Sequence, residues 1–343
     1  MAVLDGFADA SIRACAQALA AGELVAFPTE TVYGLGADAS NDAAVAKIFA
    51  AKGRPSNHPL IVHVDDTRQG AEGVEHFASA VPAFAQRLMQ VFWPGPLTLI
   101  LPRRADAGAV AAAGQDSIGL RCPAHPVAQA LLRQCRALGL AGLAAPSANQ
   151  FGRISPTSAA HVQGEFGDSL LVLDGGSCAV GIESTIVDCT RGVPVVLRPG
   201  GIGAAQLQAA IGQPIWSGDE ALQSLSGAAA PRASGTLEAH YAPRAKLRLM
   251  DARALQTALD LLGKVPQHSA PVIATYARVL VRSASQAVLQ RRMPQDAVAT
   301  AQQLFAVLRE FDARGVKLIW VEMPPTTPDW DGVRDRLERA AAA

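Results

Sequence analysis

One stretch, residues 24–64, constrains the fold more than any other part of the chain. A short apolar run at 24–27 predicts a buried strand, and a second run at 60–64 predicts another. Between them, Asn41 and Asp42 are good N-cap residues for a helix over about 43–51. This order of elements predicts an α/β layer fold in which polar loop residues lie at the ends of strands.

Several of those loop residues have the chemistry to bind phosphate. Lys52 and Arg54 flank a glycine where the helix ends, and Thr31, His58 and His63 lie near the strand ends. Arginine can fork onto phosphate oxygens, while lysine acts as a point charge. The alternative interpretation of the two cations is a solvated helix end, where positive charge is favourable in any case. His63 taken alone fits a hydrogen-bonded structural histidine.

The run GLGADA at 34–39 fits a loose dinucleotide-binding fingerprint, glycine-x-glycine-x-x-alanine, after a strand. The acidic residue expected about 20 residues later is missing, because residues 59–61 are Pro-Leu-Ile. The P-loop pattern, a Ser-His-Asp order and a zinc signature are also missing from the sequence. Chemistry that needs only positioning and charge neutralisation, such as adenylation, therefore fits best.

The remainder of the chain predicts two α/β domains joined by a linker. Further strands and helices alternate up to about residue 205, and some strands follow one another directly, which predicts a mixed sheet. Residues 206–243 are rich in Ala, Gly, Ser and Pro and predict a linker. Residues 244–343 alternate strands and helices and predict a smaller parallel α/β domain.

Composition and charge exclude several classes of protein. The formal net charge is zero, with 30 basic and 30 acidic residues, so a large nonspecific nucleic-acid surface is not expected. The five cysteines form no CxxC pair. The first twenty residues lack the basic region of a secretory signal, and no apolar run approaches the length of a membrane span. We expect a soluble, cytoplasmic protein without membrane contact.

Several motifs in a fixed order carry a family resemblance. These are PTETVYGLG at 28–36, KGRP at 52–55, PLIVHV at 59–64, SAN at 147–149, ESTIVD at 183–188 and RPG at 198–200. Together they resemble the L-threonylcarbamoyladenylate synthase family, over roughly residues 8–205 and more loosely beyond. The resemblance implies a YrdC-like catalytic domain with a twisted mixed sheet over 1–205. It further implies a linker or lid over 206–243 and a Rossmann-like accessory domain over 244–343.

The resemblance also implies a reaction and its participants. L-threonine, bicarbonate or carbon dioxide, and ATP with Mg²⁺ would give L-threonylcarbamoyladenylate and pyrophosphate. A separate tRNA threonylcarbamoyl transferase complex would then use the product to modify tRNA. The alternative is a noncatalytic RNA-binding YrdC-like module. Zero net charge and an aromatic content of 5% argue against it and predict weak direct tRNA binding.

Site residues follow from the resemblance position by position. It assigns Lys52 and Arg54 to catalysis, without a protein metal ligand or an obligate general base. It assigns five residues to threonine: Thr31, His63, Arg121, Ala145 and Ser184. It assigns nine to ATP, of which Tyr241 comes from the linker: Lys52, Arg54, His58, Ser117, Ser147, Asn149, Ser155, Arg198 and Tyr241.

Overall fold

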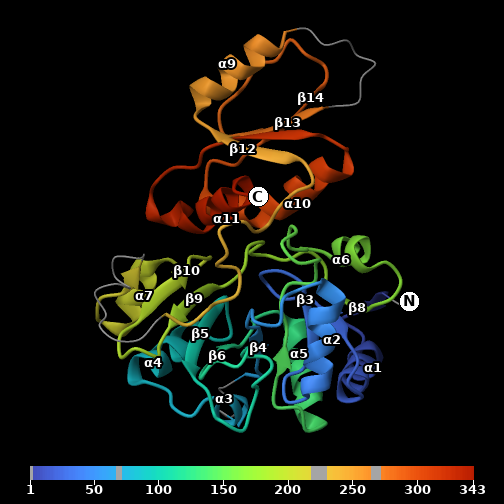
Figure 1. Ribbon diagram of the computed structural model, residues 1–343, viewed down its shortest axis with the longest axis vertical. Helices are drawn as coiled ribbons and strands as arrows, with labels where there is room; N and C mark the ends of the chain where they lie inside the picture. The colour runs from blue at the N-terminus through green and yellow to red at the C-terminus, as the bar shows by residue number, and fades with distance from the viewer. Residues whose placement is uncertain (1–2, 67–71, 218–229, 264–271) are drawn as a thin grey trace. The chain divides into compact units, whose positions relative to one another are not determined.

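The structure is a computed structural model that describes residues 3–66, 72–217, 230–263 and 272–343 (Figure 1). The chain divides into an N-terminal unit, residues 1–151 and 155–236, and a C-terminal unit, residues 152–154 and 237–343. The main boundary between the units therefore falls at 236–237 in the sequence. The sequence had predicted a first domain that ends at 205 and a second that begins at 244.

The N-terminal unit is built on a mixed sheet. Eleven strands are hydrogen-bonded side by side within the described residues, some parallel and some antiparallel, as the strand pattern predicts. In spatial order they are β1 (Val3–Asp5), β8 (Leu171–Asp174), β2 (Val25–Phe27), β3 (Gly34–Asp38), β7 (Leu143–Ala144), β4 (Ile61–His63), β6 (Ser117–Arg121), β5 (Leu97–Pro102), β9 (Thr185–Asp188), β10 (Val195–Arg198) and β11 (Trp216–Ser217).

Helices cover this sheet, and local sequence explains where the site-bearing helix begins and ends. The helices are α1 (Asp9–Ala20), α2 (Asp42–Lys52), α3 (Glu72–Phe77), α4 (Ala83–Phe92), α5 (Pro126–Ala137), α6 (Ala159–Phe166) and α7 (Ala204–Ile211). At the start of α2 the Asn41 side chain accepts a hydrogen bond from the Ala44 amide. Gly53 ends the helix in the left-handed conformation, with φ of 60°. Lys52 is thereby held at the last position of a fixed helix.

Alternate residues of the sheet enter two apolar cores. On β2, Val25 and Phe27 pack in one cluster and Ala26 in the other, and α1 and α5 cover the first cluster. Residues 34–38 form β3 and not a phosphate-binding turn. A Cβ at Gly36 would lie 2.8 Å from the Phe27 ring. The second glycine of the GLGADA run therefore serves the packing of an aromatic ring.

Residues 204–217, most of them in the predicted linker, belong to the N-terminal unit. They form α7, whose Leu207 is fully buried in the core, and β11, which pairs in parallel with β10. The prediction of a linker from 206 is wrong for this part. The composition is that of a linker, but one buried leucine and an edge strand dock the segment.

The C-terminal unit has a four-stranded sheet in which all neighbouring strands are parallel, as predicted. Its order is β12 (Lys246–Met250), β15 (Leu318–Glu322), β13 (Ile273–Ala277) and β14 (Val288–Arg292). Figure 1 shows α9 (Ala252–Leu262) on one face and α10 (Ala297–Ala313) and α11 (Asp331–Ala341) on the other. A short 3₁₀ turn, η2 (Pro328–Trp330), precedes α11. None of the helices in the described ranges is long and apolar enough to cross a membrane.

The buried carboxylate of Glu322 joins the ends of β15 and β13. It accepts hydrogen bonds from the backbone amides of Arg278 (2.6 Å) and Val279 (2.9 Å) and from the Arg278 side chain (2.7 Å). Glu322→Gln keeps the size but removes the charge, and hydrogen bonds to charged groups contribute about 1.5–3 kcal/mol. We expect faster hydrogen exchange of the β13 and β15 amides, corresponding to a loss of that size.

Glu338→Gln is the matched control. Its carboxylate lies 3.8 Å from Arg334 with 60% of the side chain exposed, so the change in opening free energy should stay below about 0.5 kcal/mol. Equal exchange rates in the two variants would contradict the assigned role of Glu322.

Candidate active site

Strand directions bring three predicted residues to one edge of the N-terminal sheet. Strand β5 is antiparallel to β6 and parallel to β9, and β9 is antiparallel to β10. The ends of β6 and β10 therefore lie beside the starts of β5 and β9. Arg121 ends β6, Arg198 ends β10 and Ser184 precedes β9. Two predicted threonine-binding residues, Arg121 and Ser184, and one predicted ATP-binding residue, Arg198, therefore share this edge.

Arg121 is buried, with 4% of its surface exposed. Its Nη1 donates to Thr31 Oγ1 at 2.8 Å and its Nε donates to the Gly95 carbonyl at 3.3 Å. Its Nη2 lies 2.7 Å from Glu30 Oε1 in an ion pair whose side chains are both nearly buried. Arg121 and Thr31, both predicted to bind the substrate threonine, are thus in direct contact. Glu30 was not predicted, although it stands between two threonines in the PTET motif.

His63 lies beside Arg121, in register on the neighbouring strand β4. The His63 ring meets Phe27 edge to face, with ring centroids 6.0 Å apart. Burial, and next the nearby Arg121 charge, lower the pKa of His63 to about 3. The ring is therefore neutral at pH 7 and offers a hydrogen-bonding group without a charge.

Lys52 is buried and tied to the predicted Ser-Ala-Asn turn. Its Nζ donates to the carbonyl of Ser147 at 2.6 Å and to the carbonyl of Asn149. Burial lowers the pKa of Lys52 well below its ordinary value, and the Arg54 charge adds to the effect. The solvated-helix-end interpretation is wrong for this residue. Lys52 fixes the turn that carries two predicted ATP residues.

Arg54 is also buried, with 8% exposed, which excludes the solvated interpretation here too. Its Nη2 donates to the Pro59 carbonyl at 3.0 Å and to Ser234 Oγ at 3.4 Å, and its Nε donates to the His58 carbonyl at 3.5 Å. The guanidinium lies over the Phe151 ring at 5.5 Å. His58 thus meets Arg54 through its backbone.

Arg198 connects the strand edge to the segment 230–236. Its Nη2 donates to the carbonyl (2.8 Å) and hydroxyl (3.1 Å) of Ser184, whose Oγ lies 2.7 Å from Thr98 Oγ1. Its Nη1 donates to the Ser234 carbonyl at 2.8 Å. Ser234 therefore contacts both predicted ATP arginines. No sequence signal marks Ser234 apart from its place in the stretch rich in Ala, Gly, Ser and Pro.

The segment 232–234 lines one side of a small cavity next to these residues. The Arg232 amide donates to Gln115 Oε1 at 2.8 Å. The cavity has a volume of about 20 Å³ and is lined by Ser117 and Thr98 among others and by residues 232–234. That is room for about one water molecule. The predicted ATP residue Ser117 thus faces the same space as Ser234.

Three further predicted site residues, Ser155, Ala145 and Tyr241, have contacts of other kinds. Ser155 donates to the Glu183 carboxylate, next to Ser184 in sequence. Ala145 is buried, and its amide donates to the Ile61 carbonyl at 2.9 Å, so it presents backbone and a methyl group. Tyr241 belongs to the C-terminal unit, where it stacks on Phe305 with ring centroids 5.4 Å apart. Its assignment to ATP stays a prediction.

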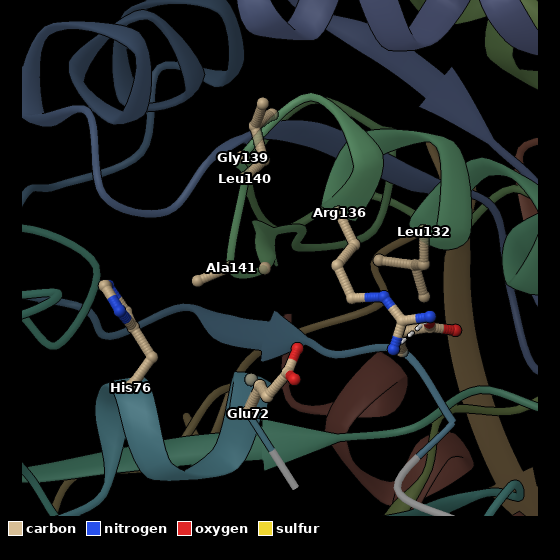
Figure 2. Close-up of a pocket in the computed structure, with 10 residues that line it drawn as sticks. Glu72, His76, Leu132, Arg136, Gly139, Leu140 and Ala141 are labelled. Atoms are coloured by element: carbon tan, nitrogen blue, oxygen red, sulfur yellow. Dashed lines mark ion pairs between the residues drawn. The ribbon is translucent and has the colours of Figure 1, made fainter. Parts of the chain in front are cut away.

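A larger cavity, of about 250 Å³, lies elsewhere in the N-terminal unit and contains none of the predicted residues (Figure 2). Glu72 and His76 reach it from α3 and Arg136 from α5, where Arg136 pairs with Asp65 at 3.3 Å. Both partners of this pair come from the cavity wall. The size of the cavity alone does not make it the active site.

Family comparisons cover nearly the whole chain. Residues 17–200 match the Sua5/YciO/YrdC family model, described as "Telomere recombination". Residues 202–342 match the model described as "Threonylcarbamoyl-AMP synthase, C-terminal domain". The two matches follow one another in the order expected of a two-domain protein.

Individual relatives are similar over nearly their full lengths. The threonylcarbamoyl-AMP synthase of Bacillus subtilis is 40% identical, with 97% of this chain and 93% of the relative covered. That of Pyrococcus abyssi is 38% identical, with 96% and 94% covered. The structure of P. abyssi Sua5 complexed with L-threonine matches with a TM-score of 0.83 and 34% identity, covering 97% of this chain and 95% of that one. On these grounds the chain belongs to the Sua5/YciO/YrdC family, in its two-domain form with the threonylcarbamoyl-AMP synthase C-terminal domain.

Proposed function

We propose that the chain is an L-threonylcarbamoyladenylate synthase, a nucleotidyltransferase. It condenses L-threonine, bicarbonate or carbon dioxide, and ATP to L-threonylcarbamoyladenylate and pyrophosphate. The observation that carries this proposal is the shared sheet edge, where buried Arg121 and buried Arg198 lie on two strands of one sheet. Full-length relatives named threonylcarbamoyl-AMP synthase support it.

The threonine carboxylate binds Arg121 in this proposal. Thr31 already accepts a hydrogen bond from Arg121, and neutral His63 lies on the next strand. Hydroxyl and imidazole groups suit the threonine side chain, because each can donate or accept a hydrogen bond. Ser184 and Ala145 complete this half of the site.

ATP phosphates take the place of Ser234 on Arg54 and Arg198. Both guanidiniums already bind oxygen atoms of that residue, at 3.4 and 2.8 Å, and phosphate oxygens are stronger acceptors of the same kind. Lys52 holds the turn from which Ser147 and Asn149 contact the nucleotide. Mg²⁺ bound to the phosphates would supply further neutralisation of their charge. The described residues offer no group of three or more His, Cys, Asp or Glu that could hold it instead.

The bond changes need positioning and charge neutralisation. A carbamate oxygen of N-carboxythreonine attacks the α-phosphorus, the bond to the bridging oxygen breaks, and pyrophosphate leaves in line. Arg54 and Arg198 offset the charge that develops on the phosphate oxygens.

The product serves a tRNA threonylcarbamoyl transferase complex, and a cytoplasmic location remains the expectation. RNA binding without catalysis is the second candidate, and filter binding of tRNA across salt concentrations tests it.

Pyrophosphate release from ATP tests the reaction directly. With the purified chain, we expect release only when L-threonine and bicarbonate are both present, because carbamate formation precedes attack on ATP. The measurement is a coupled pyrophosphate assay with each substrate omitted in turn. Release that continues at the same rate without threonine would refute the proposed synthase.

The choice of amino acid tests the threonine half of the site. A site that pairs the side-chain hydroxyl should reject alanine by about 10⁴-fold or more in kcat/KM, because its polar groups would stay unpaired. Serine lacks only a methyl group and should lose about 10–200-fold. Steady-state kinetics with the three amino acids provide the comparison, and comparable use of alanine would contradict the assignment.

Two cation variants should have different effects. Arg54→Ala should raise the KM for ATP about ten- to a hundredfold, since a charge-assisted hydrogen bond contributes about 1.5–3 kcal/mol. Lys52→Ala should also destabilise the protein by about 1–3 kcal/mol, because two buried carbonyls lose their donor. Lys47→Ala, on the same helix with 45% of the side chain exposed, is the control. ATP kinetics and urea unfolding measure both effects. A Lys52→Ala protein of unchanged stability would exclude a role for Lys52 in holding the turn at 147–149.

A further inference from the structure

Glu30 is a buried carboxylate with its position fixed from several sides. Oε1 lies 2.7 Å from Arg121 Nη2, and Oε2 accepts a hydrogen bond from the Ala124 amide at 3.1 Å. The Glu30 carbonyl accepts from the Val180 amide at 2.7 Å. The residue is 7% exposed. Few conformations are open to a side chain held in this way.

This carboxylate sits where it would hinder a simple anionic substrate. A ligand with only a carboxylate would bind Arg121 and meet the negative charge of Glu30 beside it, which disfavours binding. An α-amino acid carries both charges on neighbouring atoms. A buried cation and a buried anion 2.7 Å apart therefore match a zwitterion in both charges, and a partner for the ammonium offsets its desolvation.

We propose that Glu30 binds the α-ammonium of threonine and accepts a proton from it before carbamate formation. This assignment rests on the proposed function. A carboxylate has about four acceptor positions, and Arg121 and Ala124 use two of them. In the proposal the ammonium takes one of the other positions while the substrate carboxylate binds Arg121.

The other titratable groups around Glu30 do not duplicate its charge. Burial lowers the pKa of His125, and that of His63 is lowered to about 3. Burial raises the pKa of Cys178 to about 12. Near neutral pH these three side chains are uncharged or mainly so, and Arg121 is the cation. Glu30 thus provides the negative charge of this group.

The proton transfer balances as follows. The ammonium gives one proton to a Glu30 oxygen and becomes a free amine, whose lone pair forms the N–C bond. With bicarbonate, the C–OH bond breaks and the hydroxide leaves as water with the second N–H proton. With carbon dioxide, no bond to carbon breaks apart from the C=O π bond, and the second proton goes to solvent. The carbamate then keeps one N–H.

Two ligands separate ammonium binding from mere support of Arg121. The probes are L-threonine and 2,3-dihydroxybutanoate, in which a hydroxyl replaces the α-amino group. Titration calorimetry on the full chain should show that Glu30→Gln weakens threonine binding about ten- to a hundredfold, while binding of the hydroxy acid is unchanged or improved. Equal losses for both ligands, or no loss for either, would overturn the proposal.

Two controls keep the result decisive. Glu23→Gln removes an exposed carboxylate paired with Lys47 and should bind both ligands as the wild type does. If Glu30→Gln does not fold, the wild type alone decides: it should prefer threonine over the hydroxy acid at least about tenfold, and equal affinities would overturn the proposal. A wild type that does not bind threonine would instead refute the proposed function.

Proton acceptance has its own readout. The pyrophosphate rate of Glu30→Gln should be lost near pH 7 and recover as the pH rises above about 9, where the amine of a free amino acid, more basic than a peptide N-terminus, becomes available without a base. The wild type should show a smaller rise over the same range. A variant whose rate stays at a constant fraction of the wild type at every pH would overturn this part.

Discussion

The burial of four cationic side chains around one sheet is the constraint on which the site depends. Lys52, Arg54, Arg121 and Arg198 are each less than 9% exposed. A buried cation is costly unless polar groups surround it. Backbone carbonyls of Ser147, Asn149, Pro59, Gly95 and Ser184 are among the acceptors that these side chains use. The loops must therefore keep their shape for the cations to stay, and the cations keep the loops in shape.

The sequence predicted the features that rest on local signals, and it did not predict those that rest on contacts between distant residues. The mixed sheet, the helix ending at Lys52 and the parallel C-terminal sheet follow from apolar periodicity, caps and glycines, which are local signals. Burial of Lys52 is not a local signal, because it depends on a turn 95 residues away. From its own neighbourhood Lys52 could equally be a solvated helix end. Only the family resemblance favoured a role for Lys52 other than that of a solvated helix end.

The same reasoning accounts for the errors. Residues 206–217 have the composition of a linker, and one buried leucine with a parallel partner strand is enough to dock them. The GLGADA run is not among the errors, because the missing acidic residue already argued against a dinucleotide site, and Gly36 instead leaves room for the Phe27 ring. Glu30 was overlooked because an acid between two threonines has no periodicity. Its ion pair with Arg121, 91 residues later in the chain and 2.7 Å away, is a tertiary contact that no local pattern predicts.

Ser234 gives the segment 230–236 a defined thermodynamic role if the proposed function holds. Its carbonyl and hydroxyl satisfy Arg198 and Arg54, so phosphate and this segment compete for the same donors. Binding of ATP then includes the free energy of displacing the segment. The apparent affinity for ATP is the intrinsic affinity multiplied by the fraction of molecules in which the segment is undocked. The two arginines are meanwhile never left unsatisfied in a buried site, which would be more costly. A weak occupant that a phosphate can replace thus reconciles a stable fold with a site built to hold negative charge.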